Sequence, residues 1–362
     1  MHKRLLALAT VAVVAFAACG GGGTATTGPG TSTGGGTATG CTIGVSWNNY
    51  QEERWAKWDE PAIKAAIEAG GGKYISNDAK SSADTQNSNV ANLISQGAKV
   101  VIILAQDGTA IKTAVASALA ANVPVIAYDR LIEDPKVLYI TFDNKLVGKL
   151  QAAALLKVKS AGNFVVIKGN KADANADFLR AGYVEAGLPD VDKSTDTLKN
   201  VGETYTDNWD PAKAQAEMEQ FLTANNNKID IAFVENDGMA GGAIAALTAQ
   251  GLAGSVPVSG QDGDLAALNR VALGTQTVDV WKDSRLLGKS AGESAIALCN
   301  NPDPSKVTGT AAFTTPGGNN VSAIQLQPNP ITKDNLKDVL DAGWITKDAL
   351  CKDVTAGSVT GC

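Results

Sequence analysis

Three apolar runs of the sequence each end in two polar residues that could contact a ligand. These pairs are Asp129-Arg130, Asn236-Asp237 and Gln261-Asp262. A single aspartate or asparagine at such a place more often caps the helix that follows it. Three pairs at one edge of a sheet instead favour a shared polar site, because ligands bind at the carboxyl ends of parallel strands.

A further candidate is the segment NNYQEERWAKW at residues 48–58, which follows the apolar run TIGVSW. Two tryptophans beside one arginine are unusual in a simple connecting loop. A guanidinium donates hydrogen bonds to oxygen atoms, and a flat indole covers apolar surface with little loss of conformational freedom. The loop therefore raises the question of what Arg54, Trp55 and Trp58 contact.

The residue types at these positions suit a sugar. A pyranose presents hydroxyls that both donate and accept, which matches carboxylate and amide oxygens on one side and arginine or lysine donors on the other. Its axial C–H faces are apolar and fit against an indole. A buried carboxylate must also be paired, and Arg130 directly follows Asp129.

Several other kinds of chemistry are excluded. The only histidine is His2, so Ser-His-Asp catalysis and His-ligated zinc are absent from the mature chain. The run LLGKS at 286–290 is not a phosphate-binding loop, because Asp283 stands where the first glycine is required. Asp262 and Asp264 share one turn, whereas glycosidase carboxyls lie on opposite sides of a sugar. We therefore expect a binding protein, not an enzyme, with no metal and no cofactor.

The elements that must position these residues alternate between short apolar runs and helical stretches. Such alternation predicts an α/β fold with parallel sheets. Roughly 320 residues follow residue 40, which is enough for two cores and predicts two similar lobes. The predicted helices are 84–97, 109–121, 145–158, 211–224 and 239–250.

The N-terminus predicts export. Residues 1–18 have the charged and apolar regions of a signal peptide, and Cys19 after two alanines indicates a lipidated cysteine. An ordinary signal with a chance cysteine is the alternative. Residues 19–40 contain mainly Gly and Thr and predict a tether. We expect a lipid anchor on the outer face of the membrane, or a periplasmic location, because no later run is long enough to span a bilayer.

Charge and cysteines narrow the partners and the compartment. Lys3 and Arg4 leave with the signal, so 29 basic residues face 37 acidic ones, and this balance argues against nucleic acid. Four further cysteines in an exported chain permit two disulfides. We expect Cys299–Cys351 and Cys41–Cys362, the second because Cys41 opens the folded body and Cys362 closes the chain; free buried thiols are the alternative.

Long motifs in matching order resemble the bacterial D-xylose-binding proteins of ABC importers, in the pentose and hexose branch of the type I periplasmic binding proteins. The motifs are EERW at 52–55, AYDRLIED at 127–134, ITFDNKLVGKLQA at 140–152, LTANNNKIDIAFVENDGMAGGAIAALTAQGL at 222–252 and SGQDGDLAALNRVALGTQTVDVWK at 259–282. The resemblance implies a monomer with two Rossmann-like lobes that close around D-xylose and deliver it to a membrane permease.

The resemblance also implies a set of ligand-binding residues, and it leaves Trp58 as a packing residue. Pro61 predicts that the first helix kinks or begins there. The implied ligands are Arg54, Trp55, Asp129, Arg130, Asn175, Trp209, Asn236, Asp262 and Lys282.

The resemblance further implies that three chain crossings join the lobes, and here we expect them near residues 144, 279 and 315. The expected N-terminal lobe is 41–144 plus 280–314, the expected C-terminal lobe is 145–279 plus 315–350, and 351–362 is a tail. Two alternatives remain within the class of binding proteins. The ligand could be another aldopentose or aldohexose, or the protein could act as a sugar sensor for a receptor. Two other classes of protein are less suited to this sequence. A carbohydrate-processing enzyme would need a separated pair of acids, which this chain does not show. A transcription regulator would carry an N-terminal helix-turn-helix, where this chain has a signal and a tether.

Overall fold

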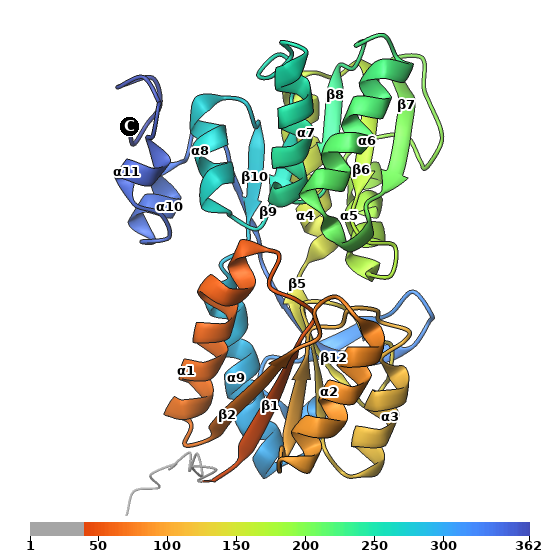
Figure 1. Ribbon diagram of the computed structural model, residues 1–362, viewed down its shortest axis with the longest axis vertical. Helices are drawn as coiled ribbons and strands as arrows, with labels where there is room; N and C mark the ends of the chain where they lie inside the picture. Colours follow the sequence, from red (N-terminus) through yellow and green to blue (C-terminus); the bar gives the residue numbers. More distant parts are fainter. Residues whose placement is uncertain (1–39) are drawn as a thin grey trace, which may run out of the picture. The chain divides into compact units, whose positions relative to one another are not determined.

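The computed structural model describes residues 40–362, and its strands form one large sheet and two small ones (Figure 1). The predicted signal at 1–18, nearly all of the predicted tether, and Cys19 lie outside these residues. No helix in the described part of the chain is long and apolar enough to cross a membrane.

The large sheet, called sheet A, is the centre of the N-terminal lobe. Its strands are β1 (Thr42–Trp47), β2 (Lys73–Asp78), β3 (Val100–Ile103), β4 (Val125–Tyr128), β5 (Leu138–Phe142), β11 (Ala311–Thr314) and β12 (Asn320–Leu326), and its helices are α1 (Glu60–Ala69), α2 (Ala83–Ser95), α3 (Lys112–Ala120) and α9 (Ser284–Asn300). The strand order is β11-β12-β5-β4-β3-β1-β2, and only the β11–β12 pair is antiparallel. In Figure 1, α1 and α9 lie together on one face of this sheet and α2 and α3 on the other.

Alternation along the strands explains these two helical layers. In β3, Val100 and Ile102 belong to the core shared with α1 and α9, while Val101 and Ile103 belong to the core shared with α2 and α3. Successive side chains of a strand point to opposite faces, so a strand covered on both faces needs apolar residues throughout. The continuous run around β3 meets that requirement.

The two small sheets form the C-terminal lobe. Its strands are β6 (Gly162–Lys168), β7 (Leu198–Tyr205), β8 (Ile231–Val234), β9 (Ser259–Gln261), β10 (Val278–Trp281) and β13 (Asn329–Ile331), and its main helices are α4 (Asn144–Val158), α5 (Ala174–Glu185), α6 (Pro211–Ala224), α7 (Asp237–Ala249) and α8 (Leu265–Leu273). A parallel bridge between Ala232 and Val258 connects the sheets β7-β6-β8 and β13-β10-β9. Helices α4 and α5 cover one face, and α6 and α7 the other. The predicted α/β fold with two parallel-sheet lobes is confirmed.

The chain passes between the lobes after β5, after β10 and after β12. Strand β5 leads directly into α4, β10 leads into α9, and β12 leads into β13. Strand β12 pairs in parallel with β5 of sheet A, whereas β13 pairs with β10 of the other lobe. All three crossings therefore lie beside one another in the sheet order, close to β5 and β10.

Two expected lobe boundaries need correction. The third crossing was expected near residue 315, but residues 311–326 form β11 and β12 of sheet A, so the crossing lies after Leu326. The second was expected near 279, but β10 pairs with β9, which places the crossing after Trp281. Strand pairing decides both boundaries, and the sequence pattern around β11 and β12 does not reveal their partners.

The first helical segment is divided just before Pro61. A π-helix at Trp55–Asp59 precedes α1, and Pro61 lies in the first turn of α1. Helical backbone already runs from residue 53 through the π turn into α1, and the N–H of Glu60 donates to the Trp55 carbonyl. Proline has no N–H to donate, and Pro61 lies where the hydrogen-bond pattern changes from π to α. The α-helix thus begins beside Pro61, and the π turn before it carries Trp55.

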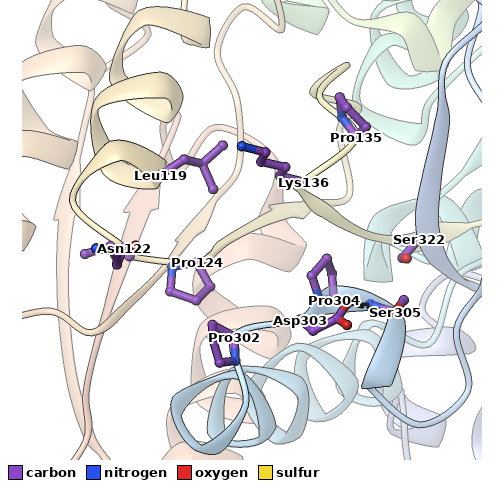
Figure 2. Close-up of a pocket in the computed structure, with 11 residues that line it drawn as sticks. Leu119, Asn122, Pro124, Pro135, Lys136, Pro302, Asp303, Pro304, Ser305 and Ser322 are labelled. Carbon is purple, nitrogen blue, oxygen red and sulfur yellow. Dashed lines mark hydrogen bonds between the residues drawn. The ribbon is translucent and has the colours of Figure 1, made fainter.

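A proline-rich hollow lies at the edge of sheet A where β4 and β5 begin (Figure 2). Pro124 comes directly before β4, and Lys136 shortly before β5. All of its lining residues belong to the N-terminal lobe, and none of them is aromatic. This hollow is therefore at the strand edge away from the residues singled out in the sequence.

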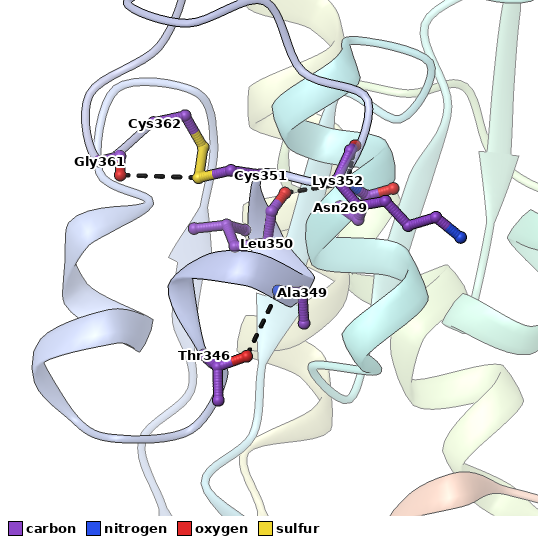
Figure 3. Close-up of a disulfide and its surroundings, with 8 residues drawn as sticks. All are labelled: Asn269, Thr346, Ala349, Leu350, Cys351, Lys352, Gly361 and Cys362. Carbon is purple, nitrogen blue, oxygen red and sulfur yellow. Dashed lines mark hydrogen bonds between the residues drawn. A yellow bond between two sulfur atoms is a disulfide. The ribbon is translucent and has the colours of Figure 1, made fainter.

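The four cysteines of the described chain form two disulfides, Cys41–Cys299 and Cys351–Cys362, the second shown in Figure 3. The expected pairing of Cys299 with Cys351 and of Cys41 with Cys362 is wrong. Cys41 precedes β1, and Cys299 lies in the last turn of α9 in the same lobe. Cys351 and Cys362 close a short loop at the other lobe. Each bond joins residues of one lobe, so neither ties the lobes together.

The C-terminal segment packs against α8. Its helices are α10 (Lys337–Asp341) and α11 (Lys347–Leu350). The side chain of Asn269 donates to the carbonyls of Leu350 and Lys352 at 2.9 and 2.8 Å, which fastens the segment to α8 (Figure 3). Trp344 stacks on Trp58 with ring centroids 4.6 Å apart. Trp58 therefore packs against this segment, as predicted.

Candidate ligand-binding site

A cavity of about 270 Å³, including its mouth, lies between the lobes at the carboxyl ends of their strands. All nine residues that the resemblance implies as ligands line it. In chain order they follow β1 (Arg54, Trp55), β4 (Asp129, Arg130), β6 (Asn175), β7 (Trp209), β8 (Asn236), β9 (Asp262) and β10 (Lys282). The fold thus gathers residues that are up to 228 positions apart in the chain around one space.

Arg54 is the central cation of this cavity. Its Nε and Nη2 donate to Asp59 Oδ2 and Oδ1 at 3.0 and 2.8 Å, and both side chains are buried. Its Nη1 lies 3.1 Å from Asp262 Oδ1 and 3.2 Å from Asp129 Oδ2. Burial alone would lower the pKa of Arg54, but Asp59 and Asp129 raise it well above its usual value. The guanidinium therefore stays charged, and its bidentate pair with Asp59 aims Nη1 at carboxylates of both lobes.

Asp129 is the main carboxylate acceptor of the N-terminal lobe. Burial alone would raise its pKa, but Lys282 and Arg54 lower it below the usual value. Its backbone is left-handed, with φ of 62°, and its carbonyl accepts from Thr141 Oγ1 at 2.8 Å. Its Oδ2 is within ion-pair distance of both cations but accepts no hydrogen bond from any residue of the range 40–362. A buried acceptor of this kind is suited to a ligand hydroxyl.

Asp262 and Lys282 provide the corresponding pair of the C-terminal lobe. Lys282 Nζ lies 3.0 Å from Asp262 Oδ1, and both side chains are buried. Lys282 directly follows β10, so it stands at the second crossing between the lobes. The same Asp262 oxygen also contacts Arg54 of the other lobe. Charges from both lobes therefore meet at one point of the cavity.

Trp55 is fixed by residues of its own lobe. Its Nε1 donates to Glu52 Oε2 at 2.6 Å, and the Arg54 guanidinium carbon lies 4.3 Å from the ring centroid. The ring also contacts Trp47 of β1, with centroids 6.4 Å apart. Only 3% of Trp55 is exposed. The indole thus faces the cavity from a position that the N-terminal lobe supplies completely.

Trp209 approaches from the other lobe, in a short 3-10 turn at Asp207–Trp209 that follows β7. Gly169 at the end of β6 makes room for the ring, because a Cβ at that position would overlap it. The indole Nε1 is buried and has no hydrogen-bond partner in the described part of the chain. Trp209 is therefore held by its backbone and by packing.

Asn175 and Asn236 add amide groups from the starts of two helices. Asn175 Nδ2 donates to the Asp129 carbonyl at 3.2 Å, and its Oδ1 accepts from Asn144 at 2.9 Å. Asn236 Oδ1 accepts from the backbone N–H of Met239 at 2.9 Å, so Asn236 caps α7 while it lines the cavity. A strand-end aspartate or asparagine was expected to cap the next helix or to face a shared site. Asn236 does both, whereas Asp129 forms ion pairs.

Three lining residues lie outside the implied ligand set: Glu52, Asp173 and Gln261, of which Gln261 was singled out only as a strand-end residue. Glu52 stands inside the EERW motif, and Gln261 is the neighbour of Asp262 at a strand end, so both carried a signal. Asp173 belongs to the other lobe, and its Oδ2 lies 3.0 Å from Arg130 Nε. No sequence signal pointed to Asp173. Burial raises the pKa of both Glu52 and Asp173, although Arg130 opposes that shift. Glu52 orients Trp55 and contacts Arg130, and Asp173 pairs with Arg130 from the other lobe.

This arrangement is suited to binding a neutral polyhydroxy compound. Donors, carboxylates and amides face one space that two indoles border. No cluster of three His, Cys, Asp or Glu side chains in the stretch 40–362 is arranged to hold a metal ion. Hydroxyls can both donate to the carboxylates and accept from Arg54 or Lys282 without adding a charge to the buried site.

The sequence of this chain is similar to those of known binding proteins. A family model described as "Periplasmic binding protein domain" matches residues 43–303. The chain is 40% identical over 299 residues to the D-xylose-binding periplasmic protein of Escherichia coli strain K12, which covers 82% of this chain and 88% of that protein. The D-xylose-binding periplasmic protein of Haemophilus influenzae is 36% identical over 310 residues, 85% of this chain and 91% of that one.

The fold is also shared with a solved structure. A carbohydrate transporter solute binding protein from Chloroflexus aurantiacus, in complex with D-glucose, matches with a TM-score of 0.76 at 29% identity. The match covers 86% of this chain and 98% of that one. The similarity therefore extends over both lobes.

Proposed function

The chain belongs to the periplasmic binding protein family, and from that premise we propose that it is an extracytoplasmic sugar-binding protein that captures D-xylose for an ABC importer. The family consists of solute-binding proteins, not enzymes. One observation carries the proposal: two indoles, three cations and several carboxyl and amide groups from both lobes line one small cavity. Such a set matches the apolar faces and the hydroxyls of one monosaccharide.

In this proposal the nine implied ligands take the roles that the resemblance gives them. Trp55 and Trp209 stack on the sugar from the two lobes, while the charged and amide side chains bind its hydroxyls. Arg54 donates from Nη1, and Asp129 accepts at Oδ2, an atom without a hydrogen-bond partner within residues 40–362. Because the site is buried, each of these hydrogen bonds gains strength from the low local dielectric.

D-xylose is the ligand best supported by the relatives. The two proteins from Escherichia coli and Haemophilus influenzae are named for D-xylose binding, and both cover more than four fifths of this chain. D-glucose is the second candidate, since the Chloroflexus aurantiacus structure holds that sugar at 29% identity. One hydroxyl contact is enough to separate such sugars, because an unpaired polar group in a buried site is costly.

Closure of the two lobes is the mechanism of capture. Arg54, Trp55 and Asp129 belong to one lobe, and Trp209 and Asp262 to the other, so a sugar touches both sets only when the lobes are together. Binding therefore shifts the population from open to closed. The closed form is then the shape that a membrane permease recognises.

Lipidation of Cys19 would keep the protein at the outer face of the membrane, with residues 20–40 as a tether. Acyl chains would hold the protein without a transmembrane helix. Detergent phase partitioning of the wild type and of Cys19→Ala tests this part. Loss of the detergent-phase fraction in Cys19→Ala is expected, and equal partitioning of both proteins would contradict it.

Isothermal titration of the purified protein against D-xylose, D-ribose, L-arabinose, D-glucose and D-galactose tests the ligand. We expect one-to-one binding that is tightest for D-xylose, at a dissociation constant of about 1 μM or lower, which corresponds to roughly −8 kcal/mol. Tightest binding of D-glucose would select the second candidate. If none of the five sugars gave a binding signal, the family membership would stand but the proposed ligand class would be refuted.

A further inference from the structure

The turn that carries Trp209 has an uncommon backbone. Asn208 and Trp209 have φ values of 59° and 57°, both in the left-handed region. Asparagine adopts this region more readily than other side chains, but a bulky residue there is an outlier. The position of the Trp209 ring follows directly from this backbone, so contacts that hold the turn also set the ring.

The C-terminal lobe packs against the Trp209 ring, but its backbone hydrogen bonds reach only the ends of this turn. The N–H of Trp209 donates to the Thr206 carbonyl at 3.1 Å, and the N–H of Asp210 donates to the Asp207 carbonyl at 3.3 Å. Neither bond uses the carbonyl groups of Asn208 and Trp209. Those two acceptors face the N-terminal lobe, from which they receive hydrogen bonds.

Two glutamines of the N-terminal lobe supply these bonds. Gln51 Nε2 donates to the carbonyls of Asn208 and Trp209 at 3.2 and 3.3 Å. Gln106 Nε2 donates to Asn208 Oδ1 at 2.8 Å. Gln106 is itself fixed, because it is buried and its backbone N–H donates to Gln86 Oε1 at 2.7 Å.

We propose that Gln51 and Gln106 are positioning residues that set the Trp209 ring from the opposite lobe when the lobes close. Neither side chain lines the cavity, so both act through Trp209. The inference rests on the proposed function, since the ring needs a set position only if it stacks on a sugar. It adds a direct lobe-to-lobe contact to the ligand contacts that favour the closed form.

The kinetics of binding separate this role from a general structural one. These hydrogen bonds exist only while the lobes are together, so their loss speeds opening and leaves the encounter of sugar with the open form unchanged. Gln106→Met keeps the side-chain length but removes the donor. We expect the dissociation rate constant of D-xylose to rise about 3- to 10-fold, as for one net hydrogen bond, with the association rate constant unchanged within about twofold.

The experiment is stopped-flow binding of D-xylose, followed by tryptophan fluorescence, in a double-mutant cycle of Gln106→Met with Asn208→Gly. Glycine adopts the left-handed backbone without a Cβ and removes the oxygen that Gln106 contacts. In the Asn208→Gly background, Gln106→Met should therefore have no further effect on dissociation. Gln51→Met is expected to speed dissociation in both backgrounds, because it contacts backbone carbonyls. Gln220→Met, an exposed change on α6, is the matched control and should leave both rate constants unchanged.

Two results would overturn the inference. The first is a wild-type chain that binds D-xylose and a Gln106→Met variant with the same dissociation rate constant. The second is an equal effect of Gln106→Met with and without Asn208→Gly, since the contact between the two side chains would then contribute nothing. Absence of sugar binding by the wild type would overturn the proposed function, and this inference with it.

Discussion

Trp55 and Trp209 face the same cavity from different lobes, but the contacts that fix their rings have different origins. The indole N–H of Trp55 donates to Glu52 at 2.6 Å, and Arg54 covers the ring, so its own lobe supplies all that it needs. Trp209 has no hydrogen bond on its indole within residues 40–362, and Gln51 of the other lobe contacts its backbone. The ring of Trp55 is thus held within its own lobe, whereas the turn that carries Trp209 also accepts hydrogen bonds from the other lobe.

The carboxylates of the two halves differ in a related way. Asp129 lies among cations, and its pKa is lowered by Lys282 and Arg54 against the effect of burial. Behind Asp262, the carboxylates of Asp237 and Asp279 lie together, and both accept from the N–H of Gly263 at 3.1 Å. Burial raises the pKa of both of these acids, that of Asp279 to about 8. Both halves therefore use ion pairs at the cavity, and the second half also has a buried acid pair behind Asp262.

The largest effect is expected from Arg54→Met. This change leaves Asp59 buried without its bidentate partner and also removes the cation between Asp129 and Asp262. The free energy of unfolding should fall by about 3–5 kcal/mol, measured by urea denaturation. Lys57→Met, which removes an exposed pair with Glu53, is the control and should cost at most about 1 kcal/mol. Similar losses in the two variants would contradict the central role of Arg54.

The acid pair predicts a pH dependence of stability. Between about pH 4 and pH 8 the folded protein keeps the proton of Asp279, whereas the unfolded chain loses it. The free energy of unfolding should therefore fall as the pH rises through this window, by up to about 1.4 kcal/mol per unit. Asp279→Asn should flatten this slope. A stability that rises from pH 5 to pH 8, or an unchanged slope in the variant, would contradict the raised pKa of Asp279.

The two rings themselves can be compared with Trp55→Phe and Trp209→Phe. The first change leaves the buried Glu52 carboxylate without its indole donor, while the second removes an N–H that has no partner in the described chain. Trp55→Phe should weaken sugar binding by about 1–3 kcal/mol, and Trp209→Phe by less than about 1 kcal/mol, in isothermal titration. The reverse order would mean that the indole N–H of Trp209 binds the sugar directly.

The smallest effect is expected from Glu52→Gln. The amide oxygen can still accept from Trp55, and the contact with Arg130 is long, at 3.5 Å. Sugar affinity should therefore fall by less than about fivefold, or 1 kcal/mol. A loss as large as that of Trp55→Phe would show that the charge of Glu52, and not its hydrogen bond, fixes the ring.

Much of the fold was visible in the sequence because its signals are local. The run TIGVSW coincides with β1, and Pro61 marks the start of α1. Strand β2, with the sequence KYISND, was not predicted, because it is an edge strand with few apolar residues and reads as a loop. Strand β12 was assigned to the wrong lobe for a related reason, since its sequence pattern does not show which strand it pairs with.

The sequence by itself determined the α/β fold with two lobes and the polar strand ends, because burial patterns and strand-end chemistry depend on neighbouring positions. Asn175, Trp209 and Lys282 were implied only by the resemblance to a known family. Only the tertiary structure decided which cysteines pair, where the third crossing lies and that Gln106 contacts Asn208, 102 residues away. Each of these depends on the distance between segments far apart in the chain. Such distances depend on how the sheets and lobes pack, and a local sequence pattern does not show that packing.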